Sequence, residues 1–289
     1  MVTCTPPPGK SAVAVVLLVA SALWWPGSAA VAAPAPPGRP SLEVTGATRI
    51  EYDDASHEWM FRGPRVVVVR GTLRIEAPEV RYAEEIQEVT LPSGGTALTP
   101  TFEVTADRLQ ANLRTRHVTA EGHVAGRFSD ESEPMMWGTF TAHRIEVDDR
   151  AERRQFVATG RVVIVRGDRH LSGDRVVYDH QVQQGTVDGQ AELARGSDRL
   201  RADHVFADLR RHEARADDHV LLDQDGIHGS ADHATYNEPD QTAVLLGNVK
   251  ILRGRDTLAA DRATVLLGRH TAIAEGHVEV VAYPEGAAP

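Results

Sequence analysis

A short phrase, in which a glycine sits inside an alternating apolar strand, recurs through most of this 289-residue chain and constrains its fold most strongly. It reads AEGHVAG at 120–126, ATGRVVIV at 158–165, LLGNVKIL at 245–252 and AEGHVEVV at 274–281. From Gly160 the glycine, replaced once by Asp218, returns every 29 residues up to Gly276. A second anchor, a small residue followed usually by aspartate, keeps the same 29-residue step from Asp174 to Asp261. Two anchors in phase indicate a chain built from one repeated supersecondary unit.

Each unit has the pattern of β-strands. Residues two and four positions from the glycine are apolar and the interleaved ones are polar, as in a strand with one buried face. A second strand follows each aspartate anchor, and turn residues such as NEPD at 237–240 and LGRH at 267–270 separate the two. The pattern predicts an all-β fold in which a long antiparallel sheet folds over on itself around an apolar interior.

The repeat predicts about eight units of roughly 29 residues over residues 42–286. The pattern is strong over 102–286 and weaker over 42–101, where 42–71 aligns through Gly63 and 72–101 breaks into a turn-rich LPSGGTALTP. The recurrent glycine interrupts each strand at one depth, where glycine marks a bulge or bend. Asp218 suits the same place because aspartate tolerates left-handed backbone. We therefore interpret these glycines as structural corners.

The first residues differ in kind from the repeat. Lys10 precedes an apolar run of about 15 residues, which ends in a small-residue stretch with the Ala30-Val31-Ala32 motif. This is typical of a cleaved secretory signal peptide over 1–32, with a Pro/Ala-rich linker at 33–41. An uncleaved membrane anchor is the alternative. The single cysteine, Cys4, precedes the apolar run, so the exported protein has no disulfide, and the setting we expect is the periplasm.

Charge and motif content exclude several function classes. A net charge of −10 argues against nucleic acid as a partner. The 13 histidines show no metal-ligand spacing, and no carboxylate pair or nucleophile motif stands out from the repeat. We expect no catalytic residues, no metal and no cofactor. A basic column one place after the aspartate anchor is interpreted as a surface ladder paired with the aspartates, with phosphate binding as the alternative (Arg108, Arg144, Arg175, His204, His233 and Arg262).

The repeat resembles the OstA-like family of lipopolysaccharide-transport β-jellyrolls, which includes LptA, LptC and the N-terminal domain of LptD. The matching stretches are GDRVVYDH at 173–180, ADHATYNEPDQTAVLLGNVKILRG at 231–254 and ADRATVLLGRHTAIAEGHVEVV at 260–281. The resemblance covers 102–283 well and 42–101 weakly. It implies that the folded-over antiparallel sheet is an elongated open β-jellyroll, which shields lipid acyl chains and stacks end to end with itself or with other jellyrolls of that transport system. The repeat region is longer than one family domain, so one long jellyroll or two in tandem are both open.

The apolar column of the repeat gives the candidate lining of a lipid trough: Phe156, Ala158, Val162, Ile164, Ala216, Val220, Leu222, Leu245, Val249, Ile251, Ala274, Val278 and Val280. A filled core without room for lipid is the alternative. In the insertion that breaks the period, Met135, Met136 and Trp137 form an apolar cluster, interpreted as a lipid or partner contact or as a cover over the jellyroll edge.

Three functions remain open from the sequence. The first is a non-enzymatic periplasmic protein that binds lipopolysaccharide through its acyl chains and bridges the inner and outer membranes by stacking. The second is a right-handed β-helix that binds or cleaves polysaccharide, and the third is a structural surface protein that polymerises through its strand edges.

Overall fold

The computed structural model describes residues 42–100, 102–129, 137–150, 153–224, 226–266 and 271–283. Over these residues the chain forms twenty β-strands and no helix. All strand pairings described for them are antiparallel, and the strands follow one another as hairpins. The expected fold class, an all-β jellyroll made from a folded-over antiparallel sheet, is confirmed. The alternative of a right-handed β-helix is wrong, because that fold pairs its strands in parallel.

The described chain divides into two compact units. The N-terminal unit holds residues up to 167 together with 175–181, and the C-terminal unit holds 168–174 together with the residues from 182 onward. The N-terminal unit contains β1 (Glu43–Thr45), β2 (Arg49–Asp53), β3 (Glu58–Arg70), β4 (Leu73–Ala83), β5 (Glu88–Leu91), β6 (Gly95–Leu98), β7 (Phe102–Ala106), β8 (Arg108–Asn112), β9 (His117–Ser129), β10 (Trp137–Arg150) and β11 (Arg153–Arg166).

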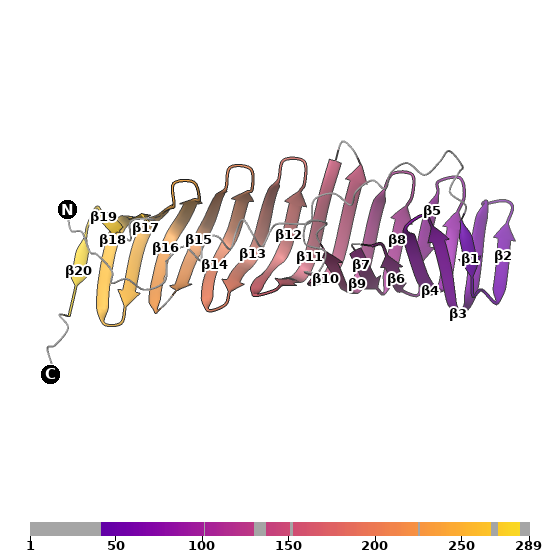
Figure 1. Cartoon of the computed structure of the whole chain (residues 1–289), viewed down its shortest axis with the longest axis horizontal. Helices are drawn as coiled ribbons and strands as arrows, with labels where there is room; N and C mark the ends of the chain where they lie inside the picture. Colours follow the sequence, from indigo (N-terminus) through magenta and orange to yellow (C-terminus); the bar gives the residue numbers. More distant parts are fainter. Residues whose placement is uncertain are drawn as a thin grey trace. The chain divides into compact units, whose positions relative to one another are not determined.

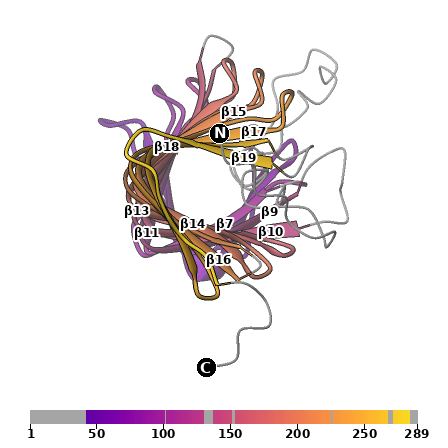
Figure 2. The same cartoon turned by 90° about the vertical axis from the view of Figure 1, so that its left-hand side faces the viewer.

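The C-terminal unit is a simple meander. It contains β13 (Gln184–Arg195), β14 (Asp198–Asp208), β15 (Glu213–Gln224), β16 (Ile227–Asn237), β17 (Thr242–Arg253), β18 (Asp256–Leu266), β19 (Thr271–Glu275) and β20 (Glu279–Val281). Residues of β12 (Arg169–Asp179) belong to both units. Figure 1 shows β13 to β18 as neighbouring arrows of alternating direction, and Figure 2 shows the strands of this unit bending around a shared interior.

Two kinds of turn alternate along the chain. In the longer turn, a side-chain oxygen caps backbone N–H groups: Asp208 Oδ1 accepts from Arg210 at 3.1 Å and from Arg211 at 3.0 Å. The shorter turn has two residues and places glycine first, with φ of 60° at Gly196 and 59° at Gly254. Type II′ hairpin turns give this position to glycine. The 12 residues of β13, the two-residue turn, the 11 residues of β14 and the four-residue turn at 209–212 together make up one 29-residue repeat.

The recurrent glycine is a bulge at the middle of a strand. In β13 the register with β14 shifts between Asp188 and Ala191, so that Gly189 and Gln190 share one facing position. Both have left-handed backbone, with φ of 74° and 50°. Asp218 takes the same conformation, with φ of 63°. The expected corners are confirmed at these positions, and the bulge bends each strand so that the sheet folds over.

Some strands break at the corner instead of bending. β1 and β2 both pair with β3, β7 and β8 both pair with β9, and β19 and β20 both pair with β18. The turn-rich stretch of 72–101 holds a corner at Gly94, with φ of 79°, between β5 and β6. Counting each broken strand once, the described chain contains eight two-strand units, as expected. Gly63 lies at a register shift between Arg62 and Val66 but does not have left-handed backbone.

One face of every long strand is buried. In β17 the inward-facing Ala243, Leu245, Val249 and Ile251 are buried or half-buried, and Leu246, Asn248 and Lys250, which face the other way, are exposed. In the N-terminal unit, four phenylalanine rings also pack together (Phe102, Phe128, Phe140 and Phe156), with centroids 5.5–6.4 Å apart. The apolar alternation in the sequence thus becomes a continuous apolar interior within each unit.

Candidate functional site

The candidate lining residues lie on the interior face, and most are buried. Eight are less than a tenth exposed: Phe156, Ala158, Val162, Ile164, Ala216, Val220, Leu245 and Val249. Leu222, Ile251 and Ala274 are half-buried. Val278 and Val280 are 44% and 51% exposed. The column is therefore buried over most of its length and open to solvent at its C-terminal end, from Val278 into β20.

Large and small side chains alternate across the interior of the C-terminal unit. Val220 faces Ala231 across the β15–β16 ladder, and Val249 faces Ala260 across β17–β18. Leu245 lies between Ala234 on one side and Ala263 on the other. Ala231, Leu245, Val249 and Ala263 form one apolar cluster, and the half-buried Leu222, Ala234 and Ile251 pack against it. The alternation gives an interior surface of branched side chains separated by methyl groups, without a charged group in the cluster.

The candidate lining predicted from the sequence comes only from the strands that carry the corner glycines, and these supply about half of the interior face. The strands that carry the aspartate anchors also point residues inward, among them Leu171, Val176, Tyr178, Leu200, Val205 and Tyr236, all 5% exposed or less. The burial of these residues was predictable, because they follow the same apolar alternation when positions are counted from the aspartate anchor. The two tyrosines are the polar members of this set. Burial raises the pKa of Tyr178 to about 12, with a smaller effect from Asp179.

Several corners carry a polar clasp on their outer side, formed by an anchor aspartate and the residue after the corner. The anchor aspartate of the neighbouring strand lies over the corner glycine, so that a Cβ added to Gly247 would lie 3.0 Å from Cβ of Asp232. The same carboxylate accepts a hydrogen bond from Asn248 Nδ2 at 2.8 Å. In other units a histidine replaces the asparagine, and the paired atoms are His Nδ1 and Asp Oδ2 (His123–Asp107 at 2.6 Å, His219–Asp203 and His277–Asp261 at 2.8 Å).

These clasps change the ionisation of two exposed histidines. The pKa of His219 is raised, first by the hydrogen bond to Asp203 and then by the charge of that carboxylate. The pKa of His277 is raised in the same way by Asp261. Position in the repeat explains these histidines fully, since each stands one place after its corner residue.

The basic column has partners other than those expected. The anchor aspartates pair with the residue after the corner, and the basic residues pair with the acid before it. His204 Nδ1 lies 3.2 Å from Asp188 Oδ1, and His233 Nδ1 lies 2.9 Å from Asp217 Oδ1. Arg144 likewise pairs with Glu121. The column is thus a surface ladder, but its partners are not the anchor aspartates.

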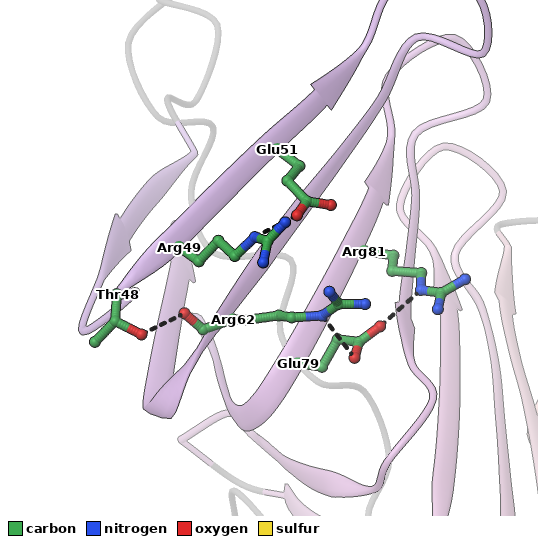
Figure 3. Close-up of polar contacts among 6 residues, drawn as sticks. All are labelled: Thr48, Arg49, Glu51, Arg62, Glu79 and Arg81. Atoms are coloured by element: carbon green, nitrogen blue, oxygen red, sulfur yellow. Dashed lines mark hydrogen bonds and ion pairs between the residues drawn. The ribbon is translucent and has the colours of Figure 1, made fainter.

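Similar ladders cover the outer face of the N-terminal unit. Glu79 accepts hydrogen bonds from Arg62 at 3.1 Å and from Arg81 at 2.9 Å, and Arg49 pairs with Glu51 two residues along β2 (Figure 3). Burial acts to raise the pKa of Glu79, but hydrogen bonds from the two arginines hold it below its usual value. Such exposed pairs add little stability individually. They keep this face polar and leave the interior as the apolar face.

Within the described ranges, no group of three or more histidine, cysteine or acidic side chains is placed to hold a metal ion. Among those same residues, no helix is long and apolar enough to cross a membrane. Met135 and Met136 lie outside the described residues. Trp137 begins β10, and its side chain also lies outside what the structure describes. Residues 1–41, where the sequence predicts a signal peptide and a linker, lie outside as well.

Comparisons with known proteins agree with the sequence pattern. Residues 228–282 match the family described as LptA/(LptD N-terminal domain) LPS transport protein, which confirms the stated resemblance over that segment. Among solved structures the chain is similar to LptH of Pseudomonas aeruginosa, described as the LptA homologous periplasmic component of the conserved lipopolysaccharide transport device. The identity is 15%, the TM-score is 0.29, and 55% of this chain and 98% of that chain are covered. A comparison with curated proteins found no match.

Proposed function

We propose that this chain is a periplasmic lipopolysaccharide-binding and transport protein, without enzymatic activity, whose apolar interior shields acyl chains from water. The observation that supports this most is the apolar column, which runs across successive strands and contains no charged group in its core cluster. The match of residues 228–282 to a lipopolysaccharide-transport family points the same way.

The free energy of transferring an acyl chain into water explains why an apolar interior that carries out no reaction would be useful. Exposing one buried CH₂ to water costs roughly 0.8 kcal/mol, so a twelve-carbon chain in water costs on the order of 10 kcal/mol. An apolar interior that accepts the chain removes most of this cost. The signal peptide expected over 1–32 would deliver the protein to the periplasm, where the lipid has to cross an aqueous space.

Bridging by end-to-end stacking forms the second part of the proposal. In the described pairings, β20 pairs with β18, and β2 pairs with β3, so each keeps one edge without a described partner. Both edge strands carry exposed apolar residues: Val280 and Val281 are each 51% exposed, and Ile50 is 57% exposed. Most proteins protect such edges. Pairing of one chain's β20 edge with the β1–β2 edge of another would cover them and extend the apolar interior.

Lipid binding is tested by equilibrium binding of the purified protein to intact lipopolysaccharide and to its deacylated polysaccharide. We expect binding of the intact lipid and none of the deacylated form. Equal binding of both would refute the proposal and favour polysaccharide recognition.

Stacking is tested separately, by sedimentation over a range of concentrations. Val281→Asp, which places a charge on the edge strand, should abolish higher oligomers. Val165→Asp, a charge on an exposed position within β11, serves as the control and should leave them intact. If wild-type protein stays monomeric at all concentrations, self-stacking is refuted. Polymers that form without any lipid binding would instead support the structural surface protein.

A further inference from the structure

Tyr236 is a polar side chain on the apolar interior face of the C-terminal unit. It lies in β16, two residues after Ala234, which packs against the core cluster. Its position in the register faces Ala214 on β15 and Ala243 on β17. Tyr236 is 5% exposed. The phenol therefore stands between two alanine methyl groups, and neither neighbour at that level offers a side-chain hydrogen-bonding group.

The hydroxyl of Tyr236 is buried and has no hydrogen-bond partner. Buried tyrosine hydroxyls usually find one, because an unpaired polar group in an apolar setting is unfavourable. Burial raises the pKa of Tyr236, and the charge of Glu238 adds to the effect, so the phenol stays protonated and can donate. Phenylalanine would fill the same space without leaving a hydroxyl unpaired. The protein alone thus gives no reason for a hydroxyl at this place.

We propose that the Tyr236 hydroxyl donates a hydrogen bond to the ester or amide carbonyl of an acylated lipid that lies along the interior. This inference rests on the proposed function and assigns a polar contact within it. An acyl chain brings one polar group into an apolar trough, the carbonyl of its linkage. A single donor between alanines pairs with that carbonyl and sets how far the chain enters. A donor without a fixed partner in the protein suits this role, since it is free for each lipid that passes.

The test compares wild-type protein with Tyr236→Phe, using three probes: lipopolysaccharide, a diacyl phospholipid, and an ether-linked dialkyl phospholipid that lacks carbonyl groups. Loss of one hydrogen bond predicts about a two- to tenfold weaker affinity for carbonyl-bearing lipid. Affinity for the ether-linked lipid should not change. The carbonyl-bearing probe that shows the loss identifies the source of the carbonyl, lipopolysaccharide or phospholipid. Tyr283→Phe, at a half-exposed tyrosine under Arg255, is the control and should change none of the affinities.

The thermal unfolding midpoint separates this role from a structural one. We expect Tyr236→Phe without lipid to unfold at the same temperature as wild type or higher, because it removes an unpaired buried hydroxyl. A lower midpoint would overturn the inference, since the hydroxyl would then have a partner in the protein. Equal affinity of both proteins for every lipid, or an equal loss with the ether-linked lipid, would also overturn it. If wild type binds none of the three probes, the proposed function fails together with this inference.

Discussion

The corner glycines give the sharpest test of how this sequence specifies its fold, and Gly247 is the best place to apply it. Gly247 has φ of 74° and lies under the carboxylate of Asp232. In Gly247→Ala, left-handed backbone for alanine costs about 1–2 kcal/mol. The new Cβ, 3.0 Å from Cβ and Cγ of Asp232, also displaces that side chain. The hydrogen bond from Asn248 to Asp232 is then lost, at about 1 kcal/mol.

The expected loss in the free energy of unfolding is therefore about 2–3 kcal/mol. Urea unfolding followed by far-UV circular dichroism measures it, and amide hydrogen exchange in β17 and β18 localises it. The repeat supplies a matched control at the equivalent position of the preceding unit. Asp218 already has left-handed backbone and a side chain there, so Asp218→Ala should cost less than about 1 kcal/mol. Equal losses in Gly247→Ala and Asp218→Ala would refute the view that the contact with the aspartate requires glycine.

Three further predictions follow from the described geometry. Leu245→Ala should destabilise the protein by about 2–5 kcal/mol in urea unfolding, and Leu246→Ala, on the opposite face of the same strand, by about 0.5 kcal/mol or less. Asp261 raises the pKa of His277, so His277 should contribute stability that is present below about pH 6.5 and is lost as the pH rises through its folded pKa. NMR titration of Asp261→Asn should show a lower pKa for His277. An unchanged pKa in that variant would contradict this. Burial acts to raise the pKa of Asp208, but hydrogen bonds from a glutamine and from two backbone N–H groups lower it overall. The contribution of Asp208 to stability is therefore present above about pH 4 and lost as the pH falls through the folded pKa. Asp208→Ala should flatten this part of an acid unfolding curve, and an unchanged curve would argue against the capping role.

The repeat made the fold largely predictable from the sequence. Alternation around Gly189, Asp218 and Gly247 predicts which residues face inward, because strand side chains alternate strictly between two faces. The first residue of the corner was predictable too, since glycine or aspartate, which tolerate left-handed backbone, stands there; the second left-handed residue, such as Gln190, gave no such signal. The corners at which a strand breaks in two were not predictable. Whether strand pairing is lost near Gly94 or Gly276 depends on the neighbouring strands as well as on the local sequence.

The candidate site was predictable only in part. Burial of Val220 and Val249 follows from the alternation, but the exposure of Val278, just before β20, and of Val280 within it depends on there being no described strand beyond them. The partners of His204 and the other basic residues were mistaken for a related reason. A bulge inserts one residue, so the side chain that faces a given position shifts by one place, and sequence spacing alone does not show in which direction.

Whether lipid enters the apolar interior is tested most directly by photocrosslinking to lipopolysaccharide. A photoreactive amino acid is placed in turn at Val162, Val220 and Val249 on the apolar column, and at Thr186 and His219 on the opposite face. The proposed function predicts lipopolysaccharide adducts from the three column positions and none from the other two. A folded protein that gives no adduct at any column position, or gives adducts from Thr186 and His219 alone, would contradict it.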